Sequence, residues 1–163
     1  MSILGISSGF HDASISIIDN DGNITYAGHS ERYSKQKNDH RLNEDIFATA
    51  LGTSVITDIA YYEKPFLKQL RQLYQGSGFD FKQICTQQIL NNSIPHKAKK
   101  RIGTGYRTHS YPHHKTHAAA GFQTSPYKDA TVVVIDAIGE FDTITIWHAE
   151  YDSRGSAKYK KLW

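Results

Sequence analysis

The chain has 163 residues and a mass of 18.4 kDa, a length typical of one domain. Its 19 lysines and arginines against 16 acidic residues give a net charge of +3, too small to indicate nucleic-acid binding by itself. The single cysteine, Cys85, excludes an intrachain disulfide. No apolar run approaches the roughly 18 residues of a membrane span, and the N-terminus lacks a signal-peptide pattern. We therefore expect a cytoplasmic protein with neither a membrane nor a nucleic-acid partner.

The first thirty residues predict three strands joined by tight turns. The apolar and β-branched runs cover residues 3–6, 13–18 and 24–28. Asp21 and Gly22 stand between the second and third runs, and an Asp-Gly pair there is a strong hairpin signal. The start of the chain is therefore predicted to be a β-meander, with residues 7–12 as its first connection.

Helical patterns dominate the next segment. Asn43 is a predicted helix cap, and Gly52 is the predicted end of that helix. A strand over residues 55–62 follows, and then a helix that begins at Pro65 and ends at Gly76.

Two further segments complete the middle of the chain. Residues 80–91 predict another helix, with Cys85 on its apolar side and so in the core. The basic residues 95–107 are predicted to form a loop and then a short extended piece.

The last third predicts one helix and a new sheet. An alanine-rich helix covers residues 113–122, after Pro112. Residues 131–136 are continuously apolar and β-branched up to the final aspartate, a pattern typical of a strand buried on both faces. Residues 141–149 are predicted to pair with it after a glycine turn, and 157–163 to begin a third strand. We find no sequence repeat.

Histidines are concentrated in one part of the chain. Five of the nine lie between positions 96 and 117: His96, His109, His113, His114 and His117. His113 and His117 are four residues apart, so a helix places them on one face, about 5–6 Å apart at Cβ. Two imidazoles in this arrangement can bind one transition metal, although a pair of solvated or packed histidines has the same spacing. The glutamate of a zinc-protease HExxH motif is absent, which disfavours that mechanism.

Asp136 is a candidate third ligand. It ends the most apolar strand of the chain, where a buried and unpaired carboxylate would be costly. The alternative is an ordinary turn aspartate before Gly139. Two histidines and one carboxylate with open positions form a non-haem iron arrangement, and zinc or manganese fits the same set.

Two other segments carry candidate functional groups. His11 and Asp12, in the first connection, could form a general base and its polarising carboxylate, or an ordinary polar turn. Arg32 and Lys37 follow the third predicted strand and suit a phosphate or carboxylate, although a solvated charge run looks the same. The basic tract 97–107 is ambiguous in the same way.

Two blocks of the sequence resemble the O-carbamoyltransferases of the nodulation and antibiotic-tailoring type. Residues 4–39, LGISSGFHDASISIIDNDGNITYAGHSERYSKQKND, are similar to that family's GIS…HDAS turn, hairpin and EERFSR-like stretch. Residues 113–140, HHKTHAAAGFQTSPYKDATVVVIDAIGE, are similar to its HHxxHAAxAFxxSPF…DG.GE block. The order, spacing and residue types agree in both blocks.

The resemblance implies an α/β fold: a mixed β-sheet with flanking helices, forming the first lobe of an actin-like domain over residues 1–163. This fold type is shared with sugar kinases and heat-shock ATPases, and the domain is related to tRNA threonylcarbamoyl transferase. Family members are several hundred residues long. The resemblance therefore implies that a second lobe, a further metal carboxylate and a YrdC-like domain lie beyond Trp163, and that residues 1–163 alone are inactive.

The resemblance also implies an activity. In that family, a carbamoyl-adenylate made from carbamoyl phosphate and ATP gives its carbamoyl group to a substrate hydroxyl. Residue by residue, His113, His117 and Asp136 match the metal ligands, with Fe²⁺ the usual ion and Zn²⁺ or Mn²⁺ left open. His11 matches the residue that deprotonates the acceptor, with Asp12 beside it.

The remaining matches concern the nucleotide. Gly139 and Glu140 match a loop that faces its phosphates, and Arg32 and Lys37 match the basic residues of the first block. The sequence departs from the family pattern at four positions without losing a candidate ligand: Ser30, Lys115, Thr116 and Ala137.

The implied partners are carbamoyl phosphate, ATP and a hydroxyl-bearing small molecule, and a homodimer of the intact enzyme stays open. Two alternatives also stay open. One is a tRNA-modifying relative whose basic tract 97–107 contacts phosphates. The other is a non-catalytic metal-binding or interaction module.

Overall fold

The computed structural model describes all residues from 1 to 163. The chain forms two compact units, one of residues 1–62 and 80–110 and the other of residues 63–79 and 111–163. The assignment of residues 1–163 to a single lobe stays a prediction. None of the helices combines the length and the apolar character that a membrane crossing requires.

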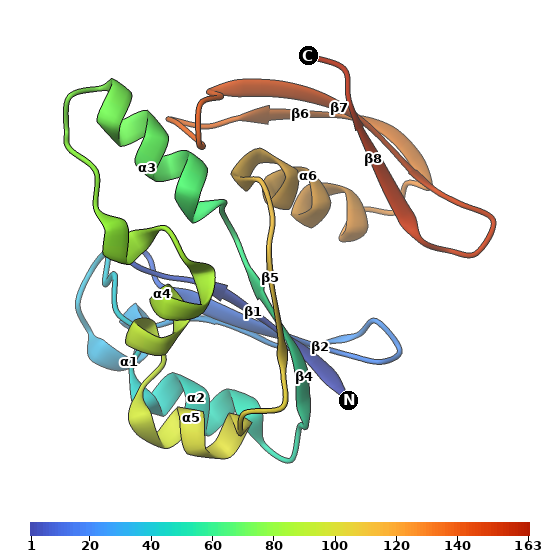
Figure 1. Ribbon diagram of the computed structural model, residues 1–163. Coiled ribbons are helices and arrows are strands. Elements are labelled where there is room, and N and C mark those ends of the chain that lie inside the picture. The colour runs from blue at the N-terminus through green and yellow to red at the C-terminus, as the bar shows by residue number, and fades with distance from the viewer. The chain divides into compact units, whose positions relative to one another are not determined.

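The first unit is built on a five-stranded mixed sheet (Figure 1). Its strands are β1 (Ser2–Ser7), β2 (Ser14–Asp19), β3 (Ile24–His29), β4 (Ile56–Tyr61) and β5 (Arg107–Ser110), in the order β3-β2-β1-β4-β5. Strand β2 is antiparallel to β1 and β3, whereas β4 and β5 continue the sheet in parallel. The predicted α/β class, with a mixed sheet and flanking helices, is confirmed.

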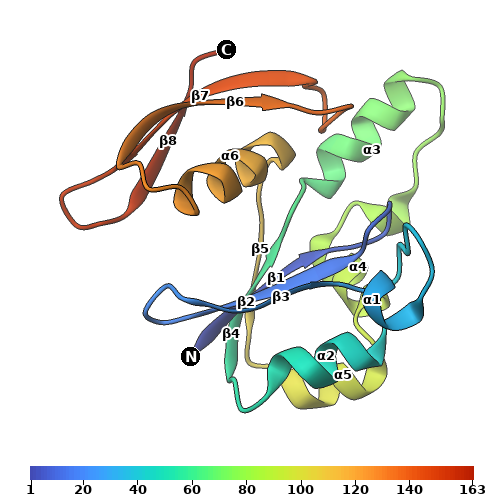
Figure 2. The same ribbon diagram turned by 180° about the vertical axis from the view of Figure 1, so that it is seen from behind.

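Helices flank this sheet (Figures 1 and 2). They are α1 (Glu31–Ser34), α2 (Glu44–Leu51), the 3-10 turn η1 (Phe81–Gln83), α4 (Thr86–Ser93) and α5 (His96–Ile102). Helices α2 and α5 lie side by side on one face, and their apolar side chains complete the core formed by the inner face of the sheet.

Helix α2 begins and ends where its sequence predicts. The Asn43 Oδ1 atom accepts the Ile46 N–H at 3.0 Å, and Gly52 follows the helix with a φ of +45° that disfavours a side chain. The Asn43 amide also donates to the Ser30 carbonyl at 3.1 Å and to its hydroxyl at 3.2 Å. The cap therefore fastens α2 to the end of β3 as well as starting the helix.

The prediction of one helix over residues 80–91 is wrong. The Asp80 carboxylate accepts the Lys82 N–H at 2.9 Å and starts only the short 3-10 turn. The chain is then extended at Cys85, which precedes the first turn of α4. Cys85 is exposed, so its assignment to the core is also wrong.

The loop predicted after residue 95 is in fact the helix α5. Ala98 and Ile102 are one turn apart and bury an apolar stripe in the core, which stabilises a helix in an otherwise basic segment. Gly103 ends it with a φ of +78°. The short extended piece predicted at the end of residues 95–107 lies later in the chain, because β5 begins only at Arg107.

The second unit holds a three-stranded antiparallel sheet. Its strands are β6 (Asp129–Ile135), β7 (Ile144–Tyr151) and β8 (Ala157–Lys161), in the order β6-β7-β8, and its helices are α3 (Pro65–Tyr74) and α6 (His113–Gln123). Helix α6 packs along β6 and β7 (Figure 1). The predicted hairpin of the last two strands with residues 131–136 is confirmed.

Strand β6 is not buried on both faces, contrary to the prediction. It is an edge strand, and its side chains alternate between the face that α6 covers and an exposed face. Val134 is buried, whereas Val133 is 56% exposed and Ile135 is 76% exposed. A run of β-branched residues suits either environment, because the sequence alone does not show which face finds a partner.

The two sheets begin with the same hairpin, although the sequence shows no repeat. Ile6 pairs with Ile15 across the first connection of one sheet, and Ile135 pairs with Ile144 across the first connection of the other. The first connection, after β1, is shorter than the one after β6, and each carries candidate functional residues. Only the alternation of apolar residues is shared, which is too general a pattern to reveal a repeat.

The cap of α2 gives the first testable prediction. Asn43→Ala removes the side-chain acceptor of the helix and its link to Ser30, so we expect the free energy of unfolding to fall by about 1–2 kcal/mol. Urea unfolding followed by circular dichroism measures this change. Asn92→Ala, at an exposed position in α4, is the matched control and should change it by less than about 0.5 kcal/mol. Equal effects of the two substitutions would contradict the capping role.

Candidate metal centre

Helix α6 is held on its sheet by one buried stripe. His114, Ala118 and Phe122, each four residues from the next, are its buried residues. Ala118 belongs to the apolar cluster that also contains Val134 and Trp147. This packing fixes the rotation of the helix about its own axis.

The two candidate histidine ligands lie on the neighbouring stripe. His113 and His117 each precede a buried residue by one position, which turns them by about 100° from the centre of the packed face. Their ring centroids are 4.7 Å apart, and their Nε2 atoms are 3.0 Å apart. The predicted sharing of one helix face is confirmed.

Asp136 meets this pair at the end of β6. Its Oδ2 atom lies 2.7 Å from the Nε2 atom of His113 and 3.5 Å from that of His117. The Asp136 N–H donates to the Thr143 carbonyl at 2.9 Å, which fixes the carboxylate at the start of the β6–β7 connection. The structure therefore brings together the three residues that the sequence proposes as ligands.

This donor set fits a divalent transition metal. The three ligand atoms lie within 4.8 Å of one another, and metal bonds of about 2.0–2.2 Å place neighbouring ligands about 3 Å apart. Two imidazole nitrogens and one carboxylate oxygen suit Fe²⁺, Zn²⁺ or Mn²⁺. The assignment of His113, His117 and Asp136 as metal ligands stays a prediction.

The protonation states around the three ligand atoms also suit a metal. Burial lowers the pKa of His117, and the neighbouring His113 lowers it further. Burial acts to raise the pKa of Asp136, but hydrogen bonds from His113 and the Ala137 N–H outweigh it, and the pKa is below its ordinary value. A neutral imidazole and an ionised carboxylate are the forms that bind a cation.

The sequence did not indicate a role for His114, the buried neighbour of His113. Its Nδ1 atom lies 2.9 Å from the Thr145 hydroxyl, which also accepts the Trp147 indole N–H at 2.7 Å. The Thr145 hydroxyl satisfies both neighbours when it accepts from the indole and donates to Nδ1. The only local signal for this role was the alternation of β7, which places Thr145 and Trp147 on one face.

The Gly139–Glu140 turn contacts α3 and α6. The Arg71 Nη1 atom donates to the Gly139 carbonyl at 2.6 Å, and a Cβ atom at position 139 would lie 2.6 Å from His114 Cδ2. Only glycine fits at that distance. The Glu140 carboxylate accepts backbone N–H groups of His113 and Lys64. The binding of nucleotide phosphates by Gly139 and Glu140 stays a prediction.

The other histidines of the sequence cluster have different surroundings. His96 begins α5 in the first unit. His109, in β5 of the same unit, lies 2.8 Å from the Asp58 carboxylate. Of the five clustered histidines, only His113 and His117 join the ligand set.

His11 and Asp12 lie in the first unit, on the connection between β1 and β2. The His11 Nδ1 atom lies 2.8 Å from Asp12 Oδ2, as expected for a histidine with a polarising carboxylate. Asp12 has a φ of +49°, and non-glycine residues in this region are enriched at functional sites. The geometry fits the predicted pair, while its catalytic role stays a prediction.

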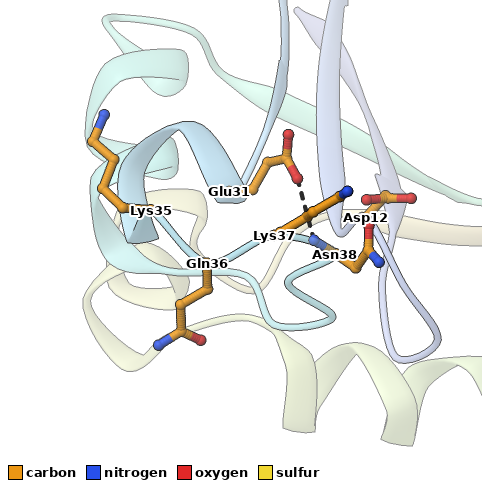
Figure 3. A pocket seen from close by; sticks show the side chains of 6 residues that line it. All are labelled: Asp12, Glu31, Lys35, Gln36, Lys37 and Asn38. Carbon is orange, nitrogen blue, oxygen red and sulfur yellow. Dashed lines mark hydrogen bonds between the residues drawn. The ribbon is translucent and has the colours of Figure 1, made fainter.

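The basic residues of the first block differ in their surroundings. Lys37 lines a surface pocket with Asp12, between α1 and the β1–β2 connection (Figure 3). Arg32 lies outside that lining, and its side chain is 79% exposed, with Glu31 Oε1 at 3.7 Å. The other residues around the pocket are Glu31, Lys35, Gln36 and Asn38.

Comparisons with known proteins identify the family. The model of the carbamoyltransferase N-terminus family matches residues 2–158, nearly the whole chain. The chain belongs to this carbamoyltransferase family. It is 26% identical over 169 residues to the uncharacterized protein sll1178 of Synechocystis sp., an alignment that covers 91% of this chain and 27% of that protein. The chain thus spans about a quarter of the length of this curated relative.

Two solved structures have limited similarity to the chain. YeaZ from Pseudomonas aeruginosa is 8% identical with a TM-score of 0.45, over 97% of this chain and 66% of that one. The Ppx/GppA family member from Aquifex aeolicus is 13% identical with a TM-score of 0.29, over 99% of this chain and 51% of that one. At these TM-scores, neither likeness carries an argument about function.

Removal of either imidazole tests the proposed ligand set. His113→Ala and His117→Ala each delete one of three donors, so we expect bound Co²⁺ or Fe²⁺ to fall at least about tenfold after dialysis, with the circular dichroism spectrum kept. Elemental analysis measures the metal. His29→Ala, at an exposed histidine of β3 far from any group of possible metal ligands in the sequence, is the control and should retain it. An unchanged metal content in the two α6 variants would refute the ligand assignment.

The pKa of His117 gives a pH dependence. Protons compete with the metal for the imidazole, and the pKa of His117 lies below its ordinary value of 6.5. The neutral form of His117 therefore persists to lower pH, and we expect protons to compete with Co²⁺ at this ligand only below about pH 6.5. Titration of the His117 imidazole by NMR between pH 5 and 8, in the metal-free protein, measures this. A midpoint above about pH 6.5 would contradict the direction of the shift.

Proposed function

We propose that this chain is the metal-binding part of a carbamoyltransferase that moves a carbamoyl group from a carbamoyl-adenylate to the hydroxyl of a small molecule. The carbamoyl-adenylate would derive from carbamoyl phosphate and ATP. One observation carries the proposal: in a chain of this family, His113, His117 and Asp136 converge within 4.8 Å. The family supports carbamoyl transfer, and the convergence supports a metal-assisted form of it.

The three converging residues would hold Fe²⁺, Zn²⁺ or Mn²⁺. When bound, such an ion would supply positive charge that stabilises an anionic donor. Asp136 would bind the ion through Oδ2, while its Oδ1 accepts the Ala137 N–H at 2.7 Å, so the carboxylate is oriented before any ligand arrives. Such orientation lowers the entropic cost of binding.

His11 is proposed to act as the general base. In the tautomer that donates from Nδ1 to Asp12, the Nε2 atom is free to accept a proton. The acceptor oxygen attacks the carbamoyl carbon, the bond from that carbon to the phosphate oxygen breaks, and AMP leaves with the electron pair. The proton of the acceptor hydroxyl moves to Nε2 of His11, and Asp12 stabilises the resulting imidazolium.

Lys37 and Arg32 are proposed to contact the anionic donor. Lys37 shares a pocket with Asp12, where its ammonium group would offset the charge of a phosphate (Figure 3). The Arg32 side chain is 79% exposed, so its guanidinium is accessible to an anion. Gly139 remains proposed as part of the phosphate-facing loop.

A tRNA acceptor has less support in this chain. The basic tract proposed for it begins in α5, where Lys97 pairs with Glu44 at 2.9 Å. Arg101 donates to the Ala48 and Gly52 carbonyls, and Lys99 donates to the Asn91 carbonyl. These cations bind their own unit, so the tract favours a structural role over phosphate contacts.

The test follows labelled carbamoyl from carbamoyl phosphate, with ATP, to hydroxyl acceptors in the longest form of the protein that contains residues 1–163. His11→Ala is expected to lower the rate by about 10²–10⁴-fold with metal content unchanged. His29→Ala, at an exposed histidine of β3, is the matched control and should keep the rate.

Two outcomes would count against the proposal. An equal rate in His11→Ala and the wild type would refute the role of His11 as base. Transfer by the wild type to tRNA alone, or to no hydroxyl acceptor at all, would refute the proposed reaction.

A further inference from the structure

Helices α3 and α6 both begin without a side-chain cap of their own. Lys64 precedes α3 and Pro112 precedes α6, and neither side chain accepts a hydrogen bond from the first turn that follows. Backbone N–H groups at a helix N-terminus lack intrahelical partners and carry partial positive charge. A carboxylate from elsewhere in the chain is therefore a favourable partner for both.

Glu140 supplies that carboxylate to both helices. Its Oε1 atom accepts the Lys64 N–H at 2.8 Å and the His113 N–H at 2.9 Å, and its Oε2 atom lies 3.0 Å from the same His113 nitrogen. Hydrogen bonds with an ionised acceptor are about twice as strong as neutral ones. One side chain thus joins the first residue of α6 to the residue that precedes α3.

The turn that carries Glu140 is fixed by its neighbours. The Arg71 side chain, from α3, donates to the Gly139 carbonyl at 2.6 Å. His114, from α6, packs so closely on Gly139 that a Cβ atom there would lie 2.6 Å from the ring. Both helices therefore hold the turn, and Glu140 completes the link by holding both helices.

The arrangement does not suit direct contact between Glu140 and a phosphate. A carboxylate repels a phosphate, and the Glu140 carboxylate is already hydrogen-bonded to two backbone N–H groups. Its bond to His113 instead controls the residue whose Nε2 atom lies 2.7 Å from Asp136. The side chain acts on the metal centre through the helix backbone.

We propose that Glu140 is a positioning residue, which locks the first turn of α6 so that His113 meets Asp136 and His117 in the geometry of one metal ion. This inference rests on the metal-binding role in the proposed function, and it assigns Glu140 to that centre rather than to the nucleotide. Residues that orient metal ligands typically contribute 10–100-fold to metal affinity.

The test compares Glu140→Ala with Glu140→Gln, using Co²⁺ as the probe. Alanine removes every acceptor, so we expect about 10–100-fold weaker Co²⁺ binding, an altered visible spectrum, and faster amide hydrogen exchange at the start of α6 in the metal-free protein. Glutamine keeps one acceptor oxygen, and we expect it to restore most of the affinity and the wild-type spectrum. Asp21→Ala, at an exposed acidic residue of the turn between β2 and β3, is the control and should behave as the wild type.

The outcomes separate this inference from the proposed function. Wild-type affinity and spectrum in Glu140→Ala, or a glutamine variant no better than alanine, would overturn the positioning role. Failure of the wild type to bind Co²⁺ would refute the metal centre itself. If the wild type binds no Co²⁺, hydrogen exchange still tests the link between Glu140 and α6. Unchanged exchange in Glu140→Ala would refute that link, and faster exchange at the start of α6 would support it.

Discussion

The packing of α6 on β6 and β7 is the constraint on which the candidate metal centre depends. The buried stripe that contains His114, Ala118 and Phe122 permits one rotation of the helix against the sheet. With that rotation fixed, the neighbouring stripe carries His113 and His117 to Asp136 at the end of β6. A helix rotated by one residue would turn both of these imidazoles by about 100°, away from the carboxylate, because they lie on the same stripe. The core packing and the chemistry of this unit therefore depend on the same register.

Much of the fold could be predicted because its signals are local. The Asn43 cap, the hairpin at Asp21 and the spacing of His113 and His117 each act within a few residues of the chain. Other features depend on distant partners. Helix α5 forms where Ala98 and Ile102 find the core, and β6 is exposed on one face because α6 covers only the other. Composition alone does not reveal such partners, so these two elements were predicted wrongly.

The same distinction applies to the candidate site. Its three proposed ligands could be named from the sequence, because a helical spacing and a strand end bring them within reach of one another. The hydrogen bonds of Glu140 that support these ligands could not be predicted from the sequence, because Glu140 lies 27 residues from His113 and 76 residues from Lys64 along the chain. A capping pattern is recognised only when the acceptor is a near neighbour of the helix start. Arg71 and His114, which contact Gly139, are also far from it along the chain. The resemblance could therefore place this turn near a ligand without showing which residues hold the turn in place.

The central claim is that His113 and His117 of α6, together with Asp136 after β6, hold one divalent metal ion. Anomalous X-ray diffraction from crystals grown with Co²⁺ tests it most directly. We expect one anomalous peak at about 2.0–2.2 Å from the Nε2 atoms of His113 and His117 and from Oδ2 of Asp136. A peak bound by other residues, or no peak at these three atoms while the crystal contains the metal, would contradict it.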